Sequence, residues 1–183
     1  MNYRIWLFIA ISLFIISLVV GWSTPDSIAS LLAEDIAALE ELSGMLASLP
    51  PALVAIFIFL KNSLSLLLSF LLSPILCLAP LLALTTNGWI LGWLSATVME
   101  KESLGFLLAG LLPHGVIELP AFIIGEAAAL SFGSFVLVSL FKKEARSLLW
   151  PRLKQNLRYL TIALGLLIPA ALIEAFITPL LMK

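Results

Sequence analysis

IWLFIAISLFIISLVVGW, residues 5–22, contains no charged side chain. An uncharged apolar run of about 18 residues or more is typical of a transmembrane helix, because about 20 residues cross the hydrocarbon core. Trp6 and Trp22 lie near its ends, where tryptophan favours the membrane interface. A cleaved signal peptide would require a small-x-small site after the run. Residues 21–25 offer a poor one, so we expect a retained membrane anchor.

The rest of the chain has the same character. Its 183 residues are 62% hydrophobic and 11% charged, with a mean hydropathy of +1.15. Soluble domains carry about 25% charged residues. The composition therefore predicts one all-α, polytopic membrane domain over residues 1–183. The net charge of −1 gives no basic surface for nucleic acid, and the single Cys77 is expected to be a buried thiol.

Further apolar runs predict a bundle of about five spans. After the first span, we predict helices at 52–73, 74–99, 116–141 and 159–181. Pro80 and Asn87-Gly88 are expected to break the third span, and Pro169 to kink the last. Residues 103–112 are apolar but too short to cross, which suits a re-entrant or interfacial segment. We expect Pro113-His114-Gly115 to end that segment.

Residues 25–49 have a different pattern. Apolar side chains recur every three or four residues, which predicts one apolar helix face, and Thr24-Pro25 is typical of a helix start. The polar face has no Lys or Arg and carries Asp26, Glu34, Asp35, Glu40 and Glu41. A helix bound to anionic lipid is basic on its polar face. We therefore expect this amphipathic helix to pack on the protein or a partner, outside the cytoplasm.

The basic residues predict the orientation. Residues 142–158 contain six of the ten Lys and Arg residues, and cytoplasmic loops concentrate such residues. With this basic loop in the cytoplasm, five spans place the N-terminus inside the cell. The same count places the amphipathic helix and the C-terminus outside. Counting 103–112 as a sixth crossing would reverse the N-terminus and the acidic helix, so we expect five spans in the cell membrane.

Polar residues inside the spans are candidates for function, because an ionisable group at membrane depth costs about 2.5–3.5 kcal/mol on insertion scales. The helical rise sorts them into two layers. The predicted midplane layer contains Lys61, Asn62, Asn87 and Glu126. The predicted outer layer contains His114, Glu118 and Glu174. We expect Lys61 and Glu126 to neutralise each other, directly or through water, since they share a depth and have opposite charges.

The outer layer is expected to form one polar site. His114 and Glu118 are one helical turn apart, and Glu174 lies at a similar depth on the last span. Without a nearby cation, the carboxyl groups are expected to be protonated, hydrogen-bonded to His114, or bound to a cation from outside. The first two make a structural contact between spans, which we favour over a cation site.

Two further patterns predict helix packing. Asn62, Ser65, Ser69 and Ser73 form a polar stripe at steps of three or four residues. Ala121, Gly125 and Ala128 continue the face of His114 and Glu118 with small residues, and with Gly115 they would allow close approach of another helix. Both patterns are also consistent with a role in helix packing and no further function.

The segment PHGVIELPA at 113–121 resembles the signature of the stage II sporulation protein M family of integral membrane proteins. Three other segments agree with that family in order: Lys61-Asn62, NGWILG at 87–92 and IEAFITP at 173–179. Ala129 departs from the pattern, where a glycine is expected. The resemblance implies a multi-span helical fold. The namesake acts with partner membrane proteins in cell-wall remodelling during engulfment, although many relatives come from organisms that make no spores.

Three functions are consistent with these residues. The chain could be a component of a membrane assembly that binds other membrane proteins or a second copy in the lipid bilayer. It could be a permease or channel, with Lys61, Asn87 and Glu126 along a polar path. An intramembrane enzyme would use His114, Glu118 and Glu174 as zinc ligands. The chain has one histidine and no H-E-x-x-H motif, so we predict no catalytic residue, cofactor or metal, and favour the assembly component.

Overall fold

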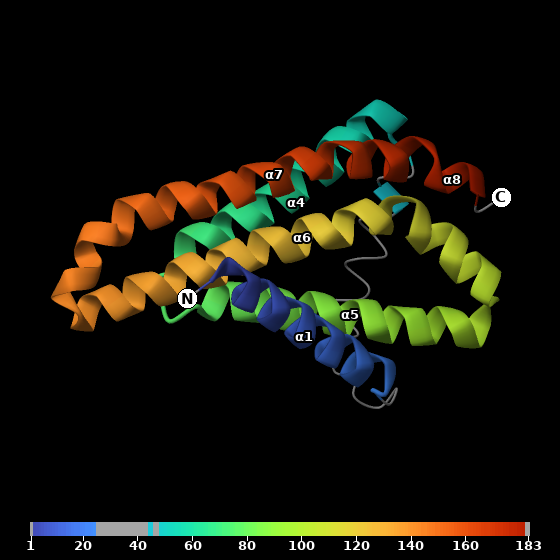
Figure 1. Cartoon of the computed structure of the whole chain (residues 1–183). Coiled ribbons are helices and arrows are strands. Elements are labelled where there is room, and N and C mark those ends of the chain that lie inside the picture. The colour runs from blue at the N-terminus through green and yellow to red at the C-terminus, as the bar shows by residue number, and fades with distance from the viewer. Residues whose placement is uncertain (1, 25–43, 46–47, 182–183) are drawn as a thin grey trace.

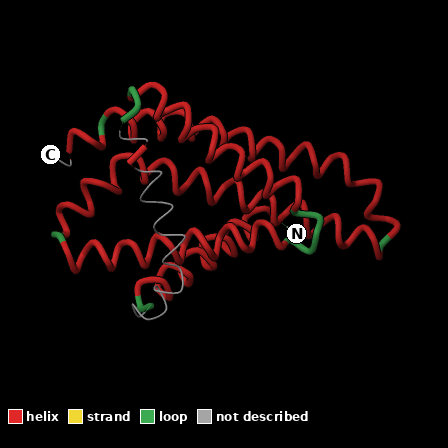
Figure 2. The backbone as a smooth tube through the Cα atoms, turned by 180° about the vertical axis from the view of Figure 1, so that it is seen from behind, coloured by secondary structure: helices red, strands yellow, loops and turns green. Residues whose placement is uncertain are grey.

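The computed structural model of the protein describes residues 2–24, 44–45 and 48–181. Nearly all of the predicted amphipathic helix at 25–49 lies outside the described residues. The described chain consists of helices joined by short turns, as Figure 2 shows from behind. Five of its helical segments are long and apolar enough to cross a membrane. The prediction of an all-α polytopic bundle with five spans is therefore confirmed.

The elements are the following, in chain order (Figure 1): α1 Tyr3–Trp22, α4 Pro51–Leu72, α5 Leu78–Lys101, α6 Leu104–Phe141, the 3₁₀ helix η2 Lys143–Leu148, α7 Leu149–Phe176 and α8 Thr178–Leu181. The helix α6 is central, because it packs against each of the other four long helices. The pair α1 and α5 covers one side of it, and the pair α4 and α7 covers the other (Figure 1). The predicted polar residues therefore lie on α6 or on helices that pack against it.

The predicted break at Pro113-His114-Gly115 is wrong. The helix α6 runs for 38 residues with Pro113 and Pro120 inside it, and Figure 1 shows a bend in its first half. Each proline removes one backbone hydrogen bond and favours bending. In lipid the remaining backbone groups must still pair within the chain, so the helix continues. Residues 103–112 hence form the first part of α6 together with its N-cap Ser103, rather than a separate segment.

Other predicted boundaries also differ. The helix α5 continues through Asn87-Gly88, and Pro80 lies in its first turn, where a missing N–H leaves no helical bond unmade. The helix α7 begins at Leu149, about ten residues before the predicted span, and η2 precedes it. Lys and Arg are good helix formers, so the basic residues do not interrupt the helix. The predicted basic loop at 142–158 is therefore mostly helical.

Glycines bring the backbones of α1 and α5 into contact. A Cβ atom at Gly92 would overlap the carbonyl oxygen of Leu18, and one at Gly88 would lie 2.7 Å from the carbonyl oxygen of Phe14. Gly133 of α6 meets the backbone of Ser73 in the same way. Such contacts replace the hydrophobic driving force that lipid does not provide between helices. The sequence predicted a helix break at Gly88 and assigned no helix contact to Gly88, Gly92 or Gly133.

The predicted packing residues differ in how closely they meet other helices. Ala121 and Ala128 are both 0% exposed, and a Cβ atom at Gly125 would lie 2.8 Å from a methyl carbon of Leu66 on α4. Gly115 is buried, but a Cβ atom there would meet only Leu111 of its own helix. Three of these four positions therefore lie in closely packed parts of the bundle.

We expect Gly92→Ala to lower the free energy of unfolding by about 1–3 kcal/mol, because the added methyl group forces the backbones of α1 and α5 apart. Gly165→Ala is the matched control, since a Cβ atom at Gly165 has nothing within 4 Å. It should leave stability unchanged or raise it slightly. Thermal unfolding in detergent measures both variants, and equal melting temperatures for them would contradict this packing.

Candidate functional site

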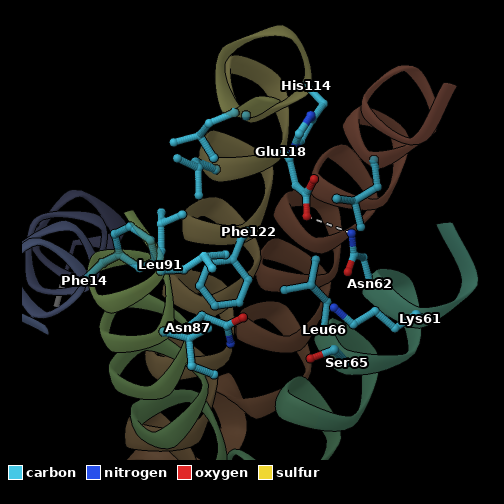
Figure 3. A pocket seen from close by; sticks show the side chains of 16 residues that line it. Phe14, Lys61, Asn62, Ser65, Leu66, Asn87, Leu91, His114, Glu118 and Phe122 are labelled. Atoms are coloured by element: carbon cyan, nitrogen blue, oxygen red, sulfur yellow. Dashed lines mark hydrogen bonds between the residues drawn. The ribbon is translucent and has the colours of Figure 1, made fainter. Parts of the chain in front are cut away.

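A cavity of about 530 Å³ lies between the membrane-spanning helices α4, α5 and α6. Its polar lining comes from all three: Lys61, Asn62 and Ser65 on α4, Asn87 on α5, and His114 and Glu118 on α6. Apolar side chains of α1, α5, α6 and α7 close the remaining walls (Figure 3). A cavity with few polar groups on an apolar wall is the usual form of a binding site.

Glu118 is held by α4. The Asn62 Nδ2 atom donates a hydrogen bond of 2.8 Å to Glu118 Oε1, across the gap between the two helices (Figure 3). This contact uses one oxygen of the carboxylate. His114 lies one turn earlier on α6, on the same face as Glu118, as the spacing of four residues requires.

The structure brings His114, Glu118 and Glu174 together from α6 and α7. One ligand atom from each lies within 4.8 Å of the others, and all three side chains are partly buried. The His114 Nδ1 atom lies 3.3 Å from the hydroxyl oxygen of Thr178, at the start of α8. Among the described residues, the Glu174 carboxylate has no hydrogen bond or ion pair. The charges of Glu118 and Lys61 both act on it.

Glu126 occupies a separate position, deeper along α6. It is 0% exposed, and the Ser69 hydroxyl donates a hydrogen bond to its Oε2 atom. Its Oε1 atom has no partner among the described residues. A buried polar group in this environment is costly unless it is hydrogen-bonded, so Ser69 fixes how α4 and α6 face each other here.

The predicted pair of Lys61 and Glu126 is wrong. Glu126 contacts Ser69, and Lys61 precedes Ser69 by eight residues, which is about 12 Å along a helix. Lys61 is exposed and extends into the cavity (Figure 3). The predicted division of the polar residues into a midplane layer and an outer layer therefore differs from the structure. Lys61, Asn62 and Asn87 share the cavity with His114 and Glu118, and Glu126 alone lies deeper.

Some contacts at the site were not predicted from the sequence. Thr178 was quoted in a family segment without a role, and its hydroxyl group meets His114. Ser69 was part of the polar stripe, and the stripe correctly marks the face of α4 that meets the carboxyl groups of α6. Asn87 lines the cavity, but its Nδ2 atom donates to the Ala83 carbonyl oxygen of its own helix.

These features define a polytopic helical membrane protein with a polar cavity among its spans. The chain matches the family described as Stage II sporulation protein M over residues 10–179, and it belongs to that family. It is 31% identical over 103 residues to an uncharacterized protein of Methanocaldococcus jannaschii. That match covers 56% of this chain and 58% of the archaeal protein. No solved structure matches the chain.

Double-mutant cycles should separate the observed contact from the predicted one. Ser69→Ala and Glu126→Met should show a coupling energy of about 0.5–1.5 kcal/mol, because each removes one partner of the same hydrogen bond. Lys61→Met and Glu126→Met should be additive, since these side chains do not meet. Unfolding of the single and double variants in detergent gives both values. Coupling between positions 61 and 126, with none between 69 and 126, would refute this arrangement of α4 and α6.

Proposed function

We propose that the protein is a component of a membrane assembly and acts by binding other integral membrane proteins. Membership of the Stage II sporulation protein M family supports this proposal, because the resemblance implies action through partner membrane proteins. The family alone does not identify a binding surface. The observation that carries the proposal lies on the face of α7 that points away from the bundle.

That face has an open position suited to another helix. Thr161 and Gly165 are exposed and four residues apart, and no atom of the described chain lies within 4 Å of a Cβ atom at Gly165. Small residues at this spacing let the backbones of two transmembrane helices approach closely. Glycine in a helix costs about 1 kcal/mol relative to alanine, and the packing of the described residues does not require it here. Ile168 and Leu172 continue the same exposed face.

The proposal includes an orientation. We place the N-terminus and the basic segment 142–158 in the cytoplasm, and the C-terminus outside. The acidic sequence 25–49 then lies outside the cytoplasm and offers a second surface for a partner. A contact inside the bilayer and one outside it would together fix the orientation of the partner. A second copy of the chain is the alternative partner at this face of α7. The mass measurement described below would detect it.

We expect Gly165→Leu to release the chain from its assembly, because the larger side chain fills the open position on α7. Extraction from native membranes into polymer nanodiscs, followed by mass measurement, should give wild-type particles heavier than one 19.9 kDa chain. The variant should give single chains with unchanged thermal stability. Leu71→Phe is the control, since Leu71 is 71% exposed on a different helix, α4.

Two outcomes would contradict the proposal. One is extraction of the wild-type chain as a single chain, and the other is a Gly165→Leu variant that keeps the full assembly. Ion flux through the purified chain alone in liposomes would instead favour a permease or channel.

A further inference from the structure

We propose that His114, Glu118 and Glu174 bind one divalent metal ion of the zinc and manganese class inside the membrane-spanning bundle. This inference is independent of the proposed assembly. One imidazole and two carboxylates form a donor set that such ions accept, and three protein ligands leave a coordination position for water. Two residues come from α6 and one from α7, so the ion would join these helices.

The distances are close to those of a metal site. Zinc lies about 2.0–2.2 Å from nitrogen and carboxylate oxygen ligands, so two ligands of one tetrahedral ion are about 3.3–3.6 Å apart. The three ligand atoms here lie within 4.8 Å of one another. A closure of up to about 1.5 Å, which side-chain rotations on the two helices provide, would bring the three atoms to ligand spacing.

The surrounding hydrogen bonds orient two of the ligands. The Thr178 hydroxyl donates to the Ile173 carbonyl oxygen at 3.4 Å, so its oxygen is placed to accept a hydrogen bond from His114 Nδ1. His114 Nε2 then has the free lone pair that a metal requires. Metal-bound histidines commonly donate their other ring N–H to an oxygen in this way. Asn62 holds Glu118 Oε1 and leaves Oε2 available.

The charges of the cluster also favour a bound cation. Glu118 and Glu174 carry two negative charges when ionised, and Lys61 supplies one positive charge at the same cavity. The Glu174 carboxylate has neither a hydrogen bond nor an ion pair within the described part of the chain. An unpaired carboxylate in an apolar medium is costly, so it takes up a cation or a proton. The cavity of about 530 Å³ beside His114 and Glu118 has room for the water that would complete the coordination of a metal.

The test uses the purified full chain in detergent after treatment with a chelator. Titration with Zn²⁺ should show one ion per chain and a higher melting temperature, and Co²⁺ should give visible absorption bands from the bound ion. Glu118→Gln, Glu174→Gln and His114→Ala should each weaken the affinity by about tenfold or more. Thr178→Val, which removes only the orienting hydroxyl, should weaken it by about tenfold.

Two control variants keep the test decisive. Glu126→Gln alters a buried carboxyl group outside the cluster, and Glu144→Gln alters an exposed one, so both should bind as the wild type does. Circular dichroism identifies any variant that fails to fold, and the folded Gln variants then decide. If the wild type binds no more Zn²⁺, Co²⁺ or Mn²⁺ than the Glu118→Gln/Glu174→Gln double variant, the carboxyl groups hold protons and the metal site is refuted.

Discussion

Two hydrogen bonds between side chains fix how α4 lies against α6. Asn62 bonds to Glu118, and Ser69 bonds to Glu126, about two turns farther along both helices. Lipid offers these groups no alternative partner, so a rotation that turns the polar stripe of α4 away from α6 would leave both carboxyl groups without a bond. Both bonds form together in the relative position of the two helices that the structure shows. The cavity and the polar cluster follow from that position, because their polar residues come largely from α4 and α6.

The site lies where α6 is locally weakened. Pro113 and Pro120 bracket His114 and Glu118, and each proline leaves one helical carbonyl group without its backbone partner. Farther along, Gly125 and Gly133 bring α6 close to α4, and Ala121 and Ala128 are fully buried. One end of α6 is therefore bent and polar, while the rest is closely packed. A cavity at the bent end is consistent with this division.

The sequence predicted the features that depend on one helix at a time. Five spans follow from apolar length, and a spacing of four residues places His114 and Glu118 on one face. The pairing of Lys61 with Glu126 failed because depth and charge do not determine how helices are rotated and aligned. Gly92 was missed because a small residue at a helix contact looks the same in sequence as one facing lipid. The break at Pro113 failed because the bilayer forces backbone groups to stay paired.

The central claim is the alignment of α4 with α6, and cysteine cross-linking in membranes tests it most directly. In a Cys77→Ser background, a short reagent that joins two thiols should link Leu66→Cys to Gly125→Cys, because these positions are in contact and both hydrogen bonds stay intact. It should not link Leu66→Cys to Phe132→Cys, because position 132 lies about two turns, or about 10 Å, farther along α6. Efficient cross-linking of positions 66 and 132, without cross-linking of 66 and 125, would contradict the account.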